Sequence, residues 1–141
     1  EIGVRLVGSE MCIRDRHYNL NVTFLGGLIM MTKEEMPACP VATTVALIGS
    51  KWKLLIIRNL RARPWRFNEL KKNLEGVSQK VLTDSLRSLE EDGIITRTVY
   101  PEVPPRVEYA LSELGESMRP IMDAMETFGL GYQEMVKEEK P

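Results

Sequence analysis

The segment between Ser78 and Gly93 carries the start and stop signals of a helix together with a strongly two-sided pattern of side chains. Serine is a preferred N-cap, and Gly93 stands where a left-handed residue usually ends a helix. At 100° per residue, the apolar side chains gather on one face, which also holds Ser85: Val81, Leu82, Leu86 and Leu89. The opposite side is polar: Gln79, Lys80, Thr83, Asp84 and Arg87. A helix over 79–92 is therefore predicted, with one face to bury and one to offer to a ligand.

Cap and breaker residues define three shorter helices before this segment. Ser50 is a suitable N-cap directly after Gly49, Pro64 stops the helix that follows, and Gly76 makes a turn. An extended link is predicted over 65–67. The three helices are predicted at residues 41–48, 51–61 and about 68–74. The last of them and the Gly76 turn lead straight into the helix over 79–92, which is a helix-turn-helix order.

A β-hairpin is predicted after Gly93. Apolar and polar side chains approach alternation over 94–100 and 106–111, and three prolines lie between the two strands: Pro101, Pro104 and Pro105. A loop of about five residues is longer than the commonest hairpin turns, so it would protrude as a wing. The predicted fold class is mainly α with a small β-hairpin wing (α+β), a winged helix-turn-helix with added N- and C-terminal dimerisation helices.

The segment after Ser112, another N-cap candidate, repeats apolar residues at alternating steps of four and three: Leu114, Met118, Ile121, Met125, Phe128, Tyr132 and Met135. Such a repeat is typical of a helix that packs along another helix. The partner is either a second copy of the chain or the core of the same domain. In the first case, the members of the repeat from Leu114 to Tyr132 are candidate dimer contacts. The repeat alone does not choose between them.

The polar face of the helix over 79–92 suits DNA. In a winged helix-turn-helix, the first turns of this helix meet base edges in the major groove, while the hairpin lies along phosphates or the minor groove. Glutamine pairs with adenine, Lys and Arg with guanine or phosphate, and an acid either orients a neighbouring cation or accepts from cytosine. Candidate contacts from the helix are Ser78, Gln79, Lys80, Thr83, Asp84 and Arg87. Candidates from the wing and for the DNA backbone are Arg66, Arg97 and Arg106.

Charge is unevenly distributed, although the 141-residue chain has a net charge of only −1. Residues 41–75 hold eight Lys/Arg and two Asp/Glu, an excess that favours a polyanion but that ordinary solvated lysines also explain. Four acids of the candidate DNA-reading helix weigh against DNA binding: Asp84, Glu90, Glu91 and Asp92. Most of them lie late in the helix, beyond the turns that enter the groove.

Six motifs, in order, resemble those of HxlR-type regulators, a MarR-like winged-helix group: Cys39-Pro40-Val41, Gly49-Ser50-Lys51-Trp52, Arg66-Phe67-Asn68-Glu69-Leu70, Ser78-Gln79-Lys80-Val81-Leu82-Thr83, Leu86-Arg87-Ser88-Leu89-Glu90-Glu91-Asp92-Gly93 and Pro104-Pro105-Arg106-Val107-Glu108-Tyr109. The resemblance runs from Cys39 to about Tyr132. It implies a bacterial or archaeal transcription factor, dimeric through its terminal helices, that binds a palindromic operator as a repressor. Residues 78–87 would read DNA and residues 97–106 would form the wing. Two positions depart from the pattern, Phe128 where Trp is frequent and Arg63 where Gly is usual.

The resemblance also implies a sensing role for Cys39, because some relatives have a cysteine just before the first helix that detects oxidants, quinones or aldehydes. A reactive thiol must be exposed and have a lowered pKa, and a helix N-terminus directly after Pro40 favours the thiolate. The alternative is a buried structural cysteine, since cysteine is among the most buried residue types.

Several classes are disfavoured by what the chain lacks. Two cysteines, Cys12 and Cys39, with the single histidine His17, do not supply a structural zinc site, and no nucleophile–base motif indicates an enzyme. No metal or cofactor is expected. The longest apolar run, residues 24–31, is too short to cross a membrane, and the few cysteines suit a reducing cytoplasm.

Residues 1–30 do not follow the pattern of the remainder. They show no helical or alternating period, and residues 1–16 resemble translated sequencing-adapter DNA, so a non-native or disordered tail is expected, with Met30 or Met31 as the start. The functional domain is then 31–141. The predicted function is a sequence-specific DNA-binding regulator that acts as a homodimer and responds to oxidants or electrophiles through Cys39. The alternative is a dimeric winged-helix protein-interaction module that has lost specific DNA binding.

Overall fold

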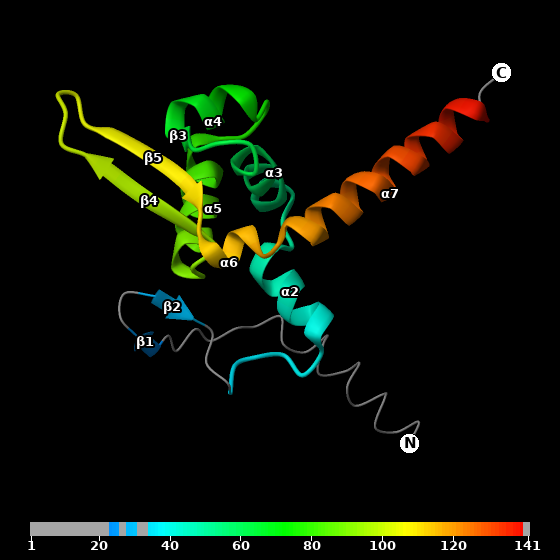
Figure 1. Cartoon of the computed structure of the whole chain (residues 1–141), viewed down its shortest axis with the longest axis horizontal. Coiled ribbons are helices and arrows are strands. Elements are labelled where there is room, and N and C mark those ends of the chain that lie inside the picture. The colour runs from blue at the N-terminus through cyan, green and yellow to red at the C-terminus, as the bar shows by residue number, and fades with distance from the viewer. Residues whose placement is uncertain (1–22, 26–27, 31–33, 140–141) are drawn as a thin grey trace.

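The computed structural model describes residues 23–25, 28–30 and 34–139 (Figure 1). The helices are α2 (Pro40–Ile48), α3 (Lys51–Leu60), α4 (Phe67–Asn73), α5 (Gln79–Glu91), α6 (Glu113–Glu116) and α7 (Arg119–Glu138). The strands are β1 (Thr23–Leu25), β2 (Leu28–Met30), β3 (Trp65–Arg66), β4 (Ile95–Tyr100) and β5 (Arg106–Leu111). The predicted elements lie within about one residue of these bounds, apart from the C-terminal segment.

The predicted cap residues act as caps. Ser50 Oγ accepts a hydrogen bond from the Lys53 backbone N–H at 3.2 Å, and Ser78 Oγ accepts one from the Val81 N–H at 3.1 Å. Gly93 has a φ of 75° directly after the C-cap of α5, which is the left-handed conformation that a helix stop requires. Short-range signals therefore fix the ends of α3 and α5.

The wing belongs to a three-stranded antiparallel sheet with the order β3-β5-β4. In β4 and β5, Arg97 lies opposite Tyr109 and Tyr100 lies opposite Arg106. The segment predicted only as an extended link pairs with β5, with Trp65 opposite Tyr109. This third strand has two residues, too few for an alternating pattern to show in the sequence.

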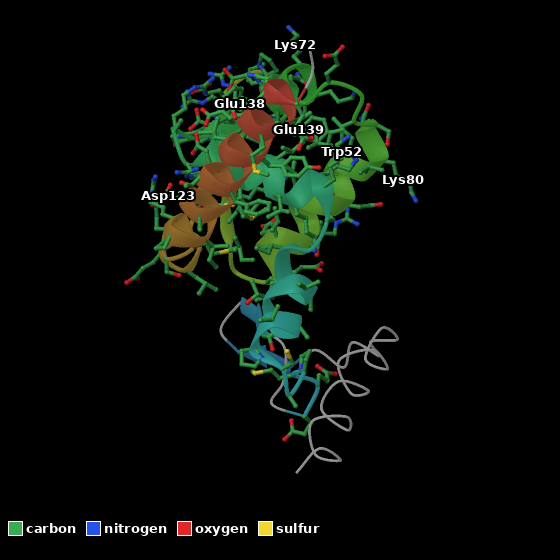
Figure 2. The ribbon with its side chains drawn as sticks, turned by 90° about the vertical axis from the view of Figure 1, so that its right-hand side faces the viewer. Trp52, Lys72, Lys80, Asp123, Glu138 and Glu139 are labelled. Atoms are coloured by element: carbon green, nitrogen blue, oxygen red, sulfur yellow. The ribbon has the colours of Figure 1, made fainter. Side chains whose placement is uncertain are left out.

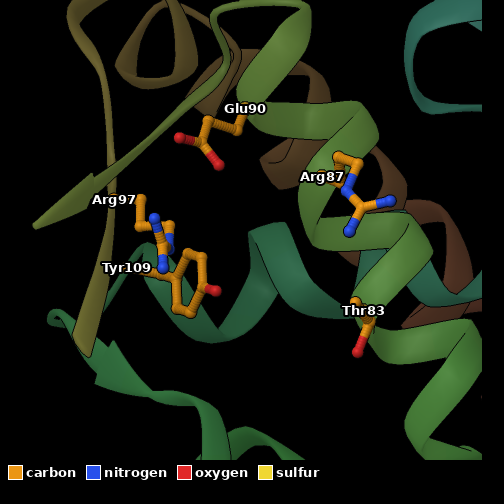
Figure 3. Close-up of a pocket in the computed structure, with 5 residues that line it drawn as sticks. All are labelled: Thr83, Arg87, Glu90, Arg97 and Tyr109. Carbon is orange, nitrogen blue, oxygen red and sulfur yellow. The ribbon is translucent and has the colours of Figure 1, made fainter. Parts of the chain in front are cut away.

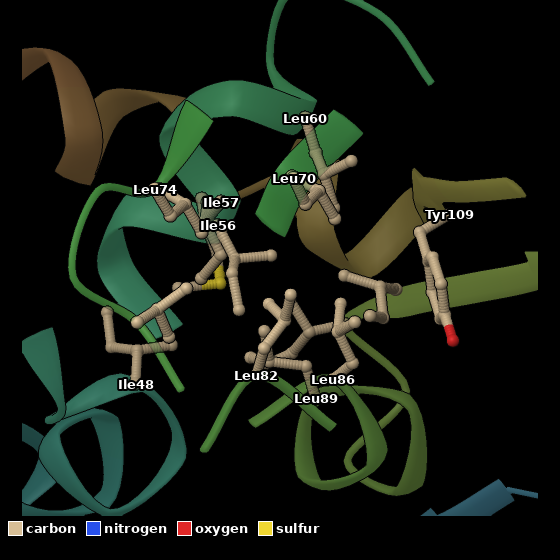
Figure 4. Packing of buried hydrophobic residues seen from close by; sticks show 14 of the residues in the cluster. Ile48, Ile56, Ile57, Leu60, Leu70, Leu74, Leu82, Leu86, Leu89 and Tyr109 are labelled. Atoms are coloured by element: carbon tan, nitrogen blue, oxygen red, sulfur yellow. The ribbon is translucent and has the colours of Figure 1, made fainter. Parts of the chain in front are cut away.

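The core lies where α3, α4 and α5 meet (Figure 4). Its fully buried side chains come from these helices and from the start of the wing: Ile56, Ile57, Leu70, Leu82, Leu86, Leu89 and Ile94. Ser85 is also buried, whereas Val81, which was predicted on the same face of α5, is 38% exposed. Val81 sits at the edge of the apolar stripe, so the prediction for this residue is wrong. Burial of the remaining stripe leaves the polar side of α5 facing outward.

The C-terminal segment is broken into two helices instead of one. Ser112 caps α6 by accepting from the Gly115 N–H at 3.0 Å, and α7 begins anew at Arg119 with Pro120 in its first turn. Gly115 allows the close approach at the break, because a Cβ atom there would lie 2.2 Å from the Ile94 carbonyl oxygen. Helix α7 then leaves the body as a straight arm (Figure 1). Met122 is its buried residue within Arg119–Glu138.

The predicted fold class is confirmed: a mainly helical winged helix-turn-helix with a small antiparallel sheet. Within the described ranges, no single helix has the length and apolarity to cross a membrane; α2 and α3 meet both criteria only as a pair bent by 80°. The strands β1 and β2 fall inside the segment expected to be a tail, and their backbones pair with each other. Whether residues 1–30 are native stays a prediction, and 1–22 and 26–27 lie outside the described residues.

Candidate nucleic-acid interface

The first turns of α5 present their polar side chains to solvent. The Lys80 side chain is 88% exposed and projects from the body (Figure 2). Its Nζ lies 3.9 Å from Asp84 Oδ2, one turn along the helix, as expected for an acid that orients a cation. The Thr83 hydroxyl donates to the Gln79 carbonyl oxygen at 2.8 Å, which leaves its methyl group and oxygen lone pairs for an external partner. Gln79 is exposed.

A cleft of about 280 Å³ separates the middle of α5 from the sheet (Figure 3). Thr83, Arg87 and Glu90 line it from the helix, and Arg97 and Tyr109 line it from the strands. Among residues 34–139, no ion pair joins Arg87 or Arg97 to a carboxylate. Two guanidinium groups are thus available on neighbouring elements, and a guanidinium is well suited to a phosphate or to the edge of guanine. The structure brings together residues 83, 87 and 97 of the predicted set.

Arg66 and Arg106 line a second cleft, of about 540 Å³, between the start of α4 and the wing tip. The Arg66 backbone N–H donates to Glu69 Oε2 at 2.8 Å, and this bond, with nearby Arg63, holds the pKa of the Glu69 carboxyl below its usual value. The Arg66 side chain itself is exposed. The two clefts share no lining residue, so Arg66 and Arg106 lie in a different cleft from Arg87 and Arg97.

Arg106 is engaged within the wing. Its guanidinium stacks on the Tyr100 ring, 4.0 Å from the centroid, and its nitrogens lie 3.3 Å from Glu102 and 3.6 Å from Glu108. Two carboxylates neutralise this cation and hold it against the sheet. Of the two predicted wing arginines, Arg97 is thus the one whose charge is available to DNA, while a DNA contact by Arg106 stays a prediction.

Apart from Asp84, the acids of this segment lie at the end of α5, away from its first turns. Asp92 is the C-cap, and burial raises the pKa of its carboxyl, partly opposed by Lys53 and reinforced by Glu91. Glu90 and Glu91 occupy the last turn of the helix. The first two turns of α5 therefore carry the Lys80–Asp84 pair and no further acid.

Several cations of the basic segment 41–75 already have partners. Arg63 stacks on the Trp65 ring at 4.0 Å from the centroid and pairs with Glu69 at 3.3 Å, while Lys51 lies 4.6 Å from the centroid of Trp52. The Trp65 indole N–H donates to the Asn59 carbonyl oxygen at 3.0 Å, which makes it a packing residue rather than a stacking platform for bases. Lys71 and Lys72 lie in the last turn of α4, and Lys72 is exposed (Figure 2). Sequence reasoning did not single out these two lysines; only the regional charge excess signalled them.

The predicted dimer residues divide into two groups. Met118 is 8% exposed and belongs to the core of its own chain. The others form an exposed stripe: Leu114, Ile121, Met125, Phe128 and Tyr132. Phe128 is 76% exposed, and Ile121, Met125 and Phe128 line an open apolar groove with Pro120 and Ala124. Val41 and Val45 add a smaller exposed pair, one helical turn apart, on α2.

Cys39 immediately precedes α2 and is half-buried. Pro40 is the first residue of that helix, so the thiol lies at the positive end of the helix dipole. Cys12 and His17 lie outside the described residues. Within 34–139, no group of three or more His, Cys, Asp or Glu side chains is placed to hold a metal ion.

Comparison with known proteins gives a family match over the same elements. The HxlR-like helix-turn-helix family matches residues 47–137. The chain belongs to the HxlR family. Its relatives include the HTH-type transcriptional regulator YdeP of Bacillus subtilis (strain 168), 40% identical over 105 residues, which cover 74% of this chain and 82% of YdeP.

Two solved structures extend the match from sequence to structure. The redox regulator HypR in its oxidized form is 42% identical with a TM-score of 0.64, covering 66% of this chain and 96% of HypR. A MarR-family protein from Porphyromonas gingivalis W83 is 45% identical with a TM-score of 0.63, covering 66% of this chain and 91% of that protein. The HxlR chain described here is therefore an HTH-type transcriptional regulator with DNA as its partner, and its family and neighbours are regulators rather than enzymes.

Proposed function

We propose that this HxlR-family regulator acts as a homodimer that binds an operator of two inverted half-sites and represses transcription there. The observation that carries the proposal is the contrast between two exposed faces. The polar face of α5 lies beside Arg97, and no ion pair within residues 34–139 engages Arg87 of that face. The apolar face of α7 is exposed along most of the helix. A DNA-reading face and a self-association face on one small domain are the two parts that such a dimer needs.

The DNA contacts follow from the side chains at the start of α5. Gln79, Lys80 and Arg87 would read base edges in the major groove, and Thr83 and Ser78 would meet phosphates or a thymine methyl. Arg97 and the exposed Arg66 would contact phosphates on either side of the groove. Asp84 would hold Lys80 in place, as their 3.9 Å separation supports.

The dimer contacts follow from the exposed stripe of α7. An apolar surface of this length costs free energy in water, and its heptad spacing suits a second α7. Two-fold pairing of α7 would direct the two α5 helices towards successive major grooves. Because the two copies would be related by a two-fold axis, the operator would be an inverted repeat. A dimer bound at a promoter would block access of RNA polymerase sterically. The protein would act in the cytoplasm, where DNA and reduced thiols are found.

We also propose that Cys39 makes the regulator responsive to oxidants or electrophiles. Its position at the start of α2 stabilises a thiolate, which attacks a peroxide or an electrophilic carbon. With a peroxide, two electrons pass from sulfur to the O–O bond, which breaks, and sulfenic acid forms; a second thiol then displaces water to give a disulfide. The likeness to the redox regulator HypR supports the proposal.

Binding to DNA tests the central claim. Fluorescence anisotropy of the reduced protein is measured on its own upstream DNA, on sites selected from a random library, and on scrambled DNA over a salt series. Tight binding that prefers one inverted repeat, with a steep salt slope, is expected. Equal, weak binding to every DNA would overturn the proposal and favour the alternative, a winged-helix module for protein contacts.

The thiol is tested in the same assay. Treatment with peroxide or a quinone is expected to change operator affinity in the wild type and to leave Cys39→Ser unaffected. Cys12→Ser is the matched control and should respond like the wild type, because Cys12 lies in the segment expected to be a non-native tail. A response that persists in Cys39→Ser would remove Cys39 as the sensor.

A further inference from the structure

A charged cluster joins the base of α7 to the end of α3. Arg61, the C-cap of α3, forms an ion pair with Asp123, and its other terminal nitrogen lies 3.5 Å from Glu126 Oε2. In the return direction, Arg119 Nη2 donates to the Arg61 carbonyl oxygen at 3.0 Å. The cluster connects residues about sixty positions apart in the chain. It thus ties the base of the arm, helix α7, to the end of α3 in the body formed by α2 to β5.

Among the described residues, few other contacts hold the arm, and one of them is the ion pair of Arg119 with Glu116 of α6. Met122 is the only buried residue within the described length of α7, and Met118 precedes the helix. Two methionine side chains are flexible and adapt to several packing angles. The direction in which α7 leaves the body therefore depends on the cluster around Arg61.

The cluster and the apolar stripe occupy different sides of α7. At 100° per residue, Asp123 and Glu126 lie on the side of the helix opposite to Ile121, Met125 and Phe128. The side of α7 that meets its own body is thus distinct from the side available to a second copy. Asp123 lies at the base of the arm, beside the body (Figure 2).

Burial of Arg61 makes the carboxylates necessary. Its side chain is only 20% exposed, and its Nε is buried with no hydrogen-bond partner among the described residues. A guanidinium removed from water needs nearby negative charge, which Asp123 and Glu126 supply. Both carboxylates are more than half exposed, so the pairs contribute little to folding and act mainly on orientation.

We propose that Arg61 is a positioning residue: with Asp123 and Glu126 it fixes the direction of α7 relative to the DNA-reading body and thereby sets the half-site spacing that the dimer accepts. The spacing part rests on the proposed function. A 20-residue helix is about 30 Å long, so a change of about 10° at its base displaces one end by about 5 Å relative to the other. Adjacent base pairs are about 3.4 Å apart, so such a change alters the preferred spacing by more than one base pair.

The first test measures the arm without DNA. Spin labels are placed at Lys72→Cys on α4 and Gln133→Cys on α7, in a Cys12→Ser/Cys39→Ser background of the full chain. The labelled chain is diluted into an excess of unlabelled chain, so that pulsed electron resonance reports distances within one chain. A narrow distribution is expected with Arg61, Asp123 and Glu126 intact.

The decisive variant is Asp123→Asn/Glu126→Gln, which removes both charges without changing side-chain size. Its distance distribution is expected to be about twofold wider, whereas Asp123→Glu, which keeps the carboxylate, stays narrow. Glu134→Gln/Glu138→Gln neutralises two carboxylates farther along α7 and is the matched control. Equal widths in the decisive variant and in this control would overturn the positioning role.

The second test measures spacing. Inverted repeats of one selected half-site are prepared with centre-to-centre separations of about 9 to 12 base pairs. The wild type is expected to prefer one spacing over its neighbours by about tenfold, and the neutral variant by no more than about twofold. Sedimentation should be unchanged and the unfolding midpoint should fall by less than about 5 °C, which separates a lost orientation from a lost fold.

The results separate the positioning role of Arg61 from the proposed binding to an inverted repeat. A wild type that binds no inverted repeat better than scrambled DNA overturns the proposed function and, with it, the spacing role. A wild type that prefers one spacing, together with a neutral variant that keeps the same preference, overturns the inference and leaves the proposed function standing.

Discussion

Helices α5 and α7 are both amphipathic, yet the chain buries the apolar face of one and exposes that of the other. In α5, Leu82, Leu86 and Leu89 are covered by α3 and by the start of the wing. In α7, the corresponding stripe continues past Met122 into solvent, and Phe128 is 76% exposed. Periodicity therefore shows that a helix has a face to bury, and the rest of the fold decides whether that face is covered within the chain or by a partner.

Charge placed on the exposed apolar stripe of α7 is expected to have the largest effect. Ile121→Glu/Met125→Glu would bring carboxylates into an apolar dimer contact, so the dimer is expected to weaken by about 5 kcal/mol or more. Sedimentation velocity at micromolar concentration should then show a monomer. Thr127→Glu/Gln133→Glu, which places the same charges off the stripe, should remain dimeric. A double mutant at 121 and 125 that stays dimeric would show that the stripe is not the interface.

Truncation in α5 should have a different consequence from truncation in α7. Leu86→Ala removes a buried side chain and is expected to lower the free energy of unfolding by about 2–5 kcal/mol. Phe128→Ala, measured by urea unfolding at concentrations where the chain is monomeric, should change it by no more than about 0.5 kcal/mol. Similar losses from both variants would mean that α7 is packed within its own chain.

The polar face of α5 is tested by removing its cations. Arg87→Ala or Lys80→Ala is expected to weaken operator binding by about 1–3 kcal/mol when the contact is bidentate to a base, without loss of the fold. Lys137→Ala, near the end of α7, is the control and should bind like the wild type in anisotropy titrations. Unchanged affinity in both α5 variants would contradict the assignment of α5 as the DNA-reading helix.

The smallest effect concerns Asp92, the C-cap of α5. Because burial raises the pKa of Asp92, its charged form destabilises the folded state at neutral pH, and this cost falls as the pH drops through the raised value. Asp92→Asn is therefore expected to stabilise the fold at pH 7 by less than about 1 kcal/mol. The gain should vanish below the ordinary carboxyl pKa, where both states of the wild type are protonated. Thermal unfolding over a pH series measures this, and a gain that grows on acidification would contradict it.

Local chemistry was predictable from the sequence. Ser50, Ser78 and Gly93 mark helix ends through bonds to residues at most three positions away, so their signals are complete within a short window. The Lys80–Asp84 pair follows from the same kind of reasoning. The two-residue strand β3 was not predictable as a strand, since its pairing partner Tyr109 is far away in the chain.

The break between α6 and α7 shows where periodicity misleads. The apolar repeat of four and three keeps its spacing through Met118, with Pro120 as the nearest breaker, although α6 ends at Glu116 and α7 begins at Arg119. Met118 consequently turns into the core while later members of the same repeat face outward. Gly115 permits this turn through its close approach to Ile94, a contact that sequence spacing does not reveal.

Caps, glycines and helical spacing fix the order of α2 to α5 and of the two wing strands, the limits of α3 and α5, and the polar and apolar sides of α5 and α7, so these features were predictable from the sequence. The tertiary structure alone decided which cations remain available: Arg106 is neutralised by Glu102 and Glu108, Arg61 is taken up by Asp123 and Glu126, and Arg87 and Arg97 are left beside one cleft. The physical reason is that charge pairing, like burial, depends on which distant segments meet in space.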